Sequence, residues 1–127
     1  MPADKFNEYH KNLTIILKSM SESLKNEQFS QRLHEDEAIN LVLQKACARE
    51  NHVSAMLTHL NAAKSFASKG NHNDKHQALA QVRNQLLAFE KSLVQNPPKL
   101  PDEDNDHVTN LVTIFRFTFS ELINSTD

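Results

Sequence analysis

The sequence contains a single glycine, Gly70, in 127 residues, and this count excludes several folds and chemistries. Phosphate-binding loops and the nucleophile elbow of hydrolases need several closely spaced glycines, so the chain carries none of these motifs. Tight β-hairpin turns also usually contain glycine, so the scarcity of glycine disfavours an antiparallel sheet. We therefore expect an all-α protein.

The composition is that of one folded domain covering residues 1–127. Charged residues make up 24% of the chain and hydrophobic residues 39%, which supports a modest core and argues against disorder. The net charge of −2, with histidine neutral, gives no bulk attraction to nucleic acid. No apolar run approaches the ~18 residues that span a bilayer. We expect neither nucleic-acid nor membrane binding.

The N-terminus and the single cysteine indicate a cytoplasmic protein. Residues 1–5 do not begin an apolar signal-peptide segment. Cys47 has no second cysteine with which to form a disulfide. It also lies in the middle of a predicted helix, away from any N-terminus that would activate it. We therefore expect a packed thiol, not a nucleophile.

Apolar residues repeat with helical periodicity in four segments, which predicts four helices. The second is much the longest, so it must either bend near Asn51, in the weakly apolar stretch 49–52, or extend beyond its neighbours and pack on a partner. The apolar pattern thus predicts a four-helix, mostly antiparallel bundle with a long second helix. The predicted helices cover residues 4–26, 31–69, 74–95 and 107–125.

The helix boundaries follow from short local patterns. Lys69 followed by Gly70 predicts the C-terminal cap of the second helix. Asp74 and Gln77 match a variant of the capping box at the start of the third. Two consecutive prolines end that helix, and residues 96–106 form a proline-rich, acidic linker to the fourth.

Histidine pairs offer one set of candidate metal ligands. His72 and His76 are four residues apart, which places both imidazoles on one helix face and forms half of a zinc or iron site. His52 and His59, two turns apart, are interpreted as residues at the edge of the core, since the Glu-x-x-His spacing of di-iron bundles is absent. The alternative function is therefore a His-rich bundle that binds a metal or haem.

The last predicted helix is apolar on more than one face. Ile114, Phe117 and Ile123 fall off its core stripe, and a helix of this kind is either buried in the bundle or lies at an interface. We interpret these three residues as partner-binding, with Phe117 the strongest candidate because aromatic side chains dominate interface energetics. The competing interpretation is that they pack against the long second helix.

Without a catalytic motif or an evident cofactor site, the chain is predicted to be a non-enzymatic protein-interaction module. It would act as an adaptor, a chaperone-like protein or a regulatory subunit, with a protein partner or as a homodimer. This step rests on analogy from the fold. A third interpretation, a pH-responsive regulator, rests on the seven histidines, which titrate near pH ~6.5 when free.

Overall fold

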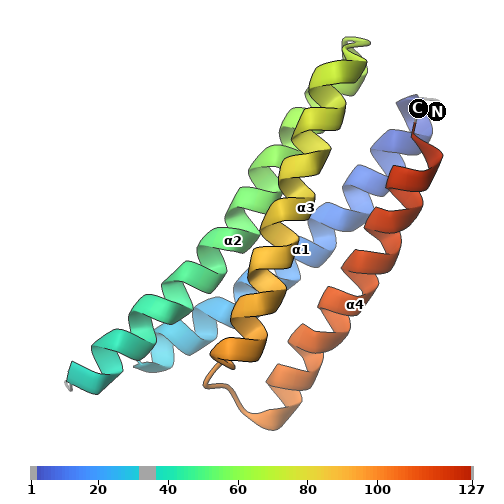
Figure 1. The fold of residues 1–127 in the computed structure, drawn as a ribbon. Coiled ribbons are helices and arrows are strands. Elements are labelled where there is room, and N and C mark those ends of the chain that lie inside the picture. Colours follow the sequence, from blue (N-terminus) through green and yellow to red (C-terminus); the bar gives the residue numbers. More distant parts are fainter. Residues whose placement is uncertain (1–2, 32–36, 127) are drawn as a thin grey trace.

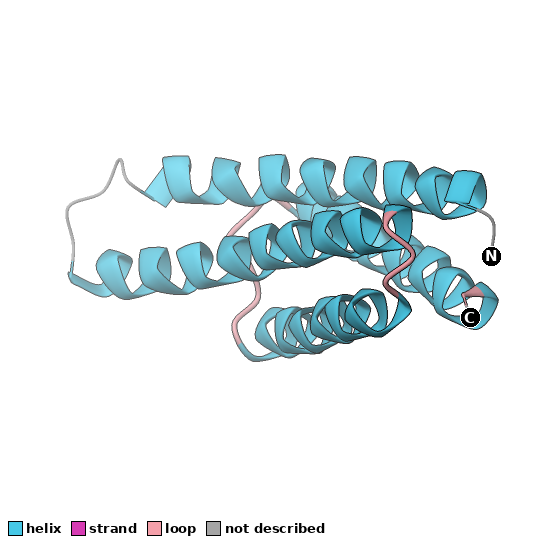
Figure 2. Cartoon of the chain, turned by 90° about the horizontal axis from the view of Figure 1, so that it is seen from above, coloured by secondary structure: helices cyan, strands magenta, loops and turns pink. Residues whose placement is uncertain are grey.

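The computed structural model describes residues 3–31 and 37–126, and it confirms an all-α bundle of four helices (Figure 1). The described residues outside the helices lie in short loops, and none of them forms a strand (Figure 2). The helices are α1 (Ala3–Gln31), α2 (Glu37–Ser68), α3 (His72–Gln95) and α4 (Asp102–Ser125).

The helices alternate in direction, so that the two ends of the chain lie at the same end of the bundle (Figure 1). The extensive helix pairs are α1 with α2, α2 with α3, and α1 with α4. No packing of that extent joins α3 to α4 over the described residues, although the two are consecutive in the chain. The bundle is therefore closed on three sides and weakly closed on the fourth.

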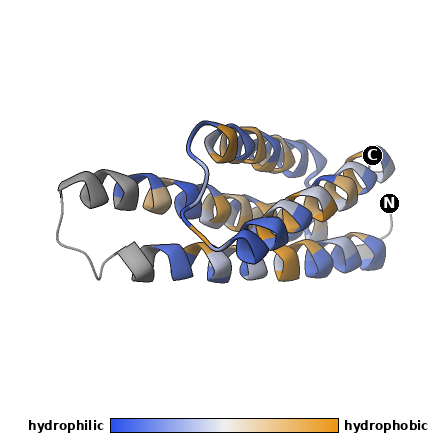
Figure 3. Cartoon of the chain, turned by 90° about the horizontal axis from the view of Figure 1, so that it is seen from below, coloured by the Kyte–Doolittle hydropathy of each residue, from blue (hydrophilic) through white to orange (hydrophobic). Residues whose placement is uncertain are grey.

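The core comes from all four helices, and apolar residues lie among hydrophilic ones along the described parts of each helix (Figure 3). The predicted apolar stripes of the first, third and fourth helices all contribute to it. Burial of this apolar area is the main favourable term in forming the bundle. The apolar side chains with no exposed surface are Leu13, Leu17, Met20, Leu24, Met56, Leu60, Ala63, Val82, Phe89, Phe115 and Leu122.

The first helix runs further than predicted, to Gln31, so the predicted break near residues 26–29 is wrong. Residues 25–31 contain neither glycine nor proline, and nothing in them stops a helix. Glu27 also continues the buried seven-residue row of Phe6, Leu13 and Met20. The predicted start of the second helix falls partly on residues 32–36, outside the described residues.

The helix α2 continues without interruption through residues 49–52, so the bend near Asn51, one of the two alternatives, is not seen there (Figure 1). The predicted C-terminal cap of α2 at Gly70 is confirmed. Gly70 has φ +71°, and the amides of Gly70 and Asn71 donate to the carbonyls of Ala67 and Phe66. This hydrogen-bond pattern is the Schellman motif, which closes a helix on a left-handed residue.

The third helix begins two residues before the predicted capping box. Its N-cap is Asn71, whose side-chain oxygen accepts from the amide of Asp74 at 3.2 Å. Asn71 Nδ2 also donates to Asp74 Oδ2 at 2.6 Å. The capping pair is therefore Asn71 with Asp74, and Asp74 lies in the first turn of α3 and is not its N-cap.

The fourth helix starts at Asp102, so the predicted linker 96–106 is shortened to residues 96–101. The acidic segment after Pro101 is the first turn of α4 itself, where carboxylates interact favourably with the positive end of the helix dipole. The helix continues through Phe115 and Phe119, whose rings stack with centroids 5.9 Å apart.

Candidate functional site

The weakly closed side of the bundle contains an apolar hollow between α3 and α4. Its volume is about 310 Å³, and we call it the seam hollow. Leu86 and Phe119 form its floor as buried side chains, while Leu87 and Ile123 are exposed at its edges. The hollow is lined by Arg83, Leu86, Leu87, Glu90, Arg116, Phe119, Ser120 and Ile123.

A single polar bridge crosses the seam hollow among the described residues. Arg116 on α4 forms an ion pair with Glu90 on α3, and its Nε donates to Glu90 Oε1 at 3.4 Å. Both side chains are partly exposed, so this bridge contributes about 0–1 kcal/mol. The contact is too weak to close the seam in place of apolar packing.

Leu87, which lines the seam hollow, belongs to a row of exposed apolar side chains on α3. Leu87 and Val94 are both exposed on α3 and lie seven residues apart. At about 100° per residue they project within about 20° of each other, so they form a row along one side of the helix. We call this row the α3 ridge. Large apolar side chains exposed beside an apolar hollow are typical of a binding surface.

The three predicted partner-binding residues do not form one patch. Phe117 is 71% exposed, and Ile114 is also exposed, so neither packs against α2. These two project about 60° apart on the outer flank of α4. Ile123 projects about 180° from Ile114 and lines the seam hollow. The structure thus places one of the three residues at the seam and the other two elsewhere.

His72 and His76 both lie on the exposed surface of the first turns of α3. His72 Nδ1 is 3.5 Å from Nζ of Lys75, which lies one turn further along the same helix. Among residues 3–31 and 37–126, no three His, Cys, Asp or Glu side chains come together as a metal site requires. The half-site predicted from spacing is therefore not completed by the neighbouring helices that the structure describes.

Two other histidines link neighbouring helices at the edge of the core, as predicted for His52. Its Nδ1 lies 2.8 Å from Oε1 of Gln85 and joins α2 to α3. His10 Nε2 lies 2.7 Å from Asn61 Oδ1 and joins α1 to α2. His59 is half-buried. Cys47 is likewise half-buried on α2.

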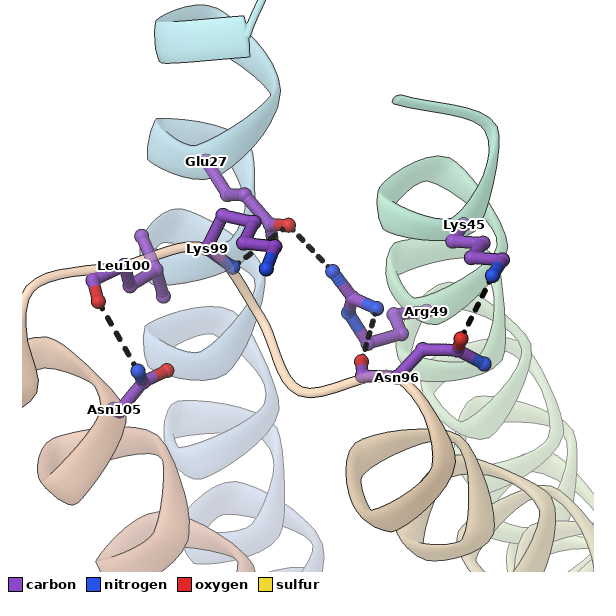
Figure 4. Close-up of polar contacts among 7 residues, drawn as sticks. All are labelled: Glu27, Lys45, Arg49, Asn96, Lys99, Leu100 and Asn105. Atoms are coloured by element: carbon purple, nitrogen blue, oxygen red, sulfur yellow. Dashed lines mark hydrogen bonds and ion pairs between the residues drawn. The ribbon is translucent and has the colours of Figure 1, made fainter. Parts of the chain in front are cut away.

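A buried ion pair anchors the linker between α3 and α4 (Figure 4). Arg49 Nη2 and Glu27 Oε1 are 2.5 Å apart, and the two residues are 1% and 0% exposed. Glu27 Oε1 also accepts from the amide of Lys99 at 3.1 Å. Arg49 Nη1 donates to the carbonyl of Asn96 at 2.6 Å. We call these two charged residues the linker anchor.

The linker anchor was not predicted, although the sequence contains a sign of it. Arg49 falls within the apolar row of the second helix, and Glu27 falls on the buried row of the first. Charges are almost never fully buried unless they are paired. Two opposite charges at core positions of adjacent helices therefore indicate a buried pair, whereas the stretch 49–52 was interpreted only as a place where the helix could bend.

A second hollow, of about 330 Å³, lies beside the linker anchor and is lined by Lys45, Arg49, Gln95, Asn96, Pro97 and Lys99. Its cations already have structural roles. Lys45 Nζ donates to Asn96 Oδ1 at 2.8 Å, and Arg49 caps the carbonyl end of α3 (Figure 4). Basic side chains commonly satisfy the last carbonyls of a helix in this way. The cations that line this hollow therefore hold the linker in place, and we do not assign the hollow to a ligand.

Comparison of the chain with protein-family models, with curated proteins and with solved structures gave no match. None of the four helices, over the residues described, combines the length and apolarity needed to cross a membrane.

Proposed function

We propose that this protein is a non-enzymatic interaction module of the cytoplasm that binds a polypeptide at the α3–α4 seam. It would serve as an adaptor, a chaperone-like protein or a regulatory subunit. The observation that carries the proposal is the apolar seam hollow with exposed Leu87 and Ile123 at its edges. An apolar floor with a few charged groups around it is the usual composition of a protein-binding surface.

The outer flank of α4 is a separate candidate contact. Ile114 and Phe117 are exposed there without an accompanying hollow. Binding energy concentrates in pockets that exclude water, and a projecting aromatic residue without a pocket provides less of it. We therefore rank the seam, with Ile123, above the outer flank, and keep Ile114 and Phe117 as a predicted second contact.

Site-specific photocrosslinking in native cell extract tests the proposal. A photoreactive amino acid replaces Leu87 or Ile123 at the seam, and in a matched control it replaces Ile15 on α1. Leu87 and Ile15 are 57% and 55% exposed, so a purely exposure-driven reaction would label both equally. We expect discrete adducts from positions 87 and 123 that are absent from position 15. Equal adduct patterns from all three positions, or none from the seam, contradict the proposal.

A further inference from the structure

We infer that the seam binds one amphipathic α-helix of another protein, which inserts two apolar side chains and presents one carboxylate. The inference rests on the proposed function and names the kind of polypeptide that binds. It is carried by two hollows that follow one another between α3 and α4, and by the charge of Arg83 beside the first of them.

A smaller hollow lies at the linker end of the seam. Its volume is about 200 Å³, and we call it the proline hollow. The Glu90–Arg116 ion pair separates it from the seam hollow, because these two residues line the end of the seam hollow that is nearer the linker. The proline hollow is lined by Leu93, Pro97, Pro98, Asn105, Val108 and Thr109.

The distance between the two hollows corresponds to two to three turns of a helix. On α3, Leu86 and Leu93 are seven residues apart, which is about 10 Å along the axis. On α4, Val108 and Phe119 are eleven residues apart, which is about 16 Å. Residues seven or eleven positions apart in a helix project within about 20° of each other. One face of a bound helix can therefore place an apolar side chain in each hollow.

The walls of the seam favour a helix over an extended segment. Both walls are α-helices, whose backbone N–H and C=O groups are paired within each helix, so they offer no edge with which a strand could pair. A bound helix likewise pairs its own backbone groups and makes contact through side chains alone. Apolar anchors on one helix face are the usual means by which a groove recognises such a helix.

Arg83 specifies a carboxylate on the bound helix. It lines the end of the seam hollow away from the linker, and no hydrogen bond or ion pair joins it to another described residue. The other two charges of the seam hollow, Glu90 and Arg116, already pair with each other. The hollow therefore has one unbalanced positive charge, which is complementary to an acidic residue about one turn beyond the first apolar anchor.

The same charge argues against a second copy of this chain as the occupant. The α3 ridge has the required spacing, since Leu87 and Val94 are seven residues apart. With Leu87 of a second copy in the seam hollow, the next turn would bring its Arg83 to the Arg83 of the first copy, and like charges repel across an interface. With Val94 there instead, the helix ends at Gln95 and supplies no carboxylate.

The test selects peptides of about 20 residues, which is about five helical turns, from a random phage-displayed library on the purified full chain. We expect the selected peptides to become helical on binding. They should carry two apolar residues seven to eleven positions apart, with Asp or Glu one turn outside one of them. Selection on the variant Arg83→Glu should replace this acidic residue by Lys or Arg, because the charge that it faces is reversed.

Affinities for seam variants, measured by fluorescence anisotropy, locate the bound peptide. Leu87→Glu in the seam hollow and Thr109→Glu in the proline hollow should each weaken binding about tenfold or more, since each places a charge in an apolar contact. The matched variant Ile15→Glu, on α1, should leave the affinity unchanged. Circular dichroism verifies that all three variants fold.

A library that yields no binding peptide overturns the inference, as do selected peptides without this spacing. Equal weakening by Leu87→Glu and Ile15→Glu also overturns it, and so does an acidic residue that persists after selection on Arg83→Glu. If seam-specific adducts still form in cell extract after such a result, the proposed function stands and only the helical occupant is wrong. If those adducts are also absent, both are refuted.

Discussion

The two connections that flank α3 hold their helices together by different means. Residues 69–71 join α2 to α3 through backbone geometry, with Gly70 at φ +71° and the amides of Gly70 and Asn71 donating to carbonyls at the end of α2. Residues 96–101 join α3 to α4 with two consecutive prolines and are held by side chains from the other two helices. There the buried pair of Glu27 and Arg49 binds the linker backbone at two points.

The difference explains why one side of the bundle is closed and the other is open. A turn of three residues forces α2 and α3 into contact along their length, and these two helices pack extensively. The longer linker lets α4 pack on α1 instead of α3. The linker anchor then fixes where α4 begins, and so fixes the width of the seam. A short backbone turn gives a tight helix pair, whereas a side-chain-held linker leaves a surface available for binding.

Removing the cation of the linker anchor should have the largest effect on stability. Arg49→Ala leaves the Glu27 carboxylate buried without its ion-pair partner, and breaking a buried pair in this way costs about 3–5 kcal/mol. Urea unfolding measures the loss of unfolding free energy. Hydrogen exchange at the Lys99 amide, which donates to Glu27, should accelerate more than exchange in the turn at residues 69–71. A loss below about 1 kcal/mol would contradict the anchoring role.

Two controls separate the buried pair from charge effects in general. Arg116→Ala removes the exposed partner of Glu90, and its cost should stay within about 1 kcal/mol. The double variant Glu27→Gln with Arg49→Met removes both buried charges and should recover much of the loss, because apolar packing often replaces a buried ion pair without cost. If the double variant is as unstable as Arg49→Ala, the role of Arg49 is steric rather than electrostatic.

Substitution of Gly70 should cost less, because it strains one residue and leaves no charge buried. A Cβ at this position would meet nothing within 4 Å, so the penalty is purely conformational. We expect a loss of about 1–3 kcal/mol for Gly70→Val, less for Gly70→Ala, and least for Gly70→Asn, which tolerates a left-handed backbone best. Thermal and urea unfolding of the three variants test this order. Equal losses for the three variants would contradict a cost that depends on how well each residue tolerates the left-handed backbone.

The features that arise from local sequence could be predicted, and those that arise from contacts between distant residues could not. Helical periodicity gave the four helices, and the lone glycine next to a basic residue located the end of α2. The pairing of Glu27 with Arg49 depends on two helices meeting at one height, which the periodicity of each helix does not specify. The early start of α4 was missed because an acidic run is compatible both with a loop and with a first helical turn.

The candidate site shows the same division. Sequence identified Ile114, Phe117 and Ile123 as apolar residues off the core stripe, and all three are exposed. Which of them shares a surface with a neighbouring helix depends on how α4 is rotated against α1. Of these three residues, only Ile123 lines the hollow beside α3. Leu87 on α3 was not predicted as a binding residue, because the apolar residues of that helix form a single core-facing stripe. A surface formed by two helices can be predicted only when the relative placement of the two helices is known.

Replacing Phe117 should have the smallest effect and so sharpens the contrast between the seam and the rest of α4. Phe117 is 71% exposed on the outer flank, and surface substitutions of this kind change stability within about 0.5 kcal/mol. We expect Phe117→Ser to match the wild type in urea unfolding and in the crosslinked adducts formed from positions 87 and 123. The buried neighbour provides the comparison, since Phe119→Ala should cost about 3–5 kcal/mol. If a photoreactive residue at position 117 instead gives discrete adducts while positions 87 and 123 give none, the binding surface is the outer flank of α4, and the open seam is only a consequence of the long linker.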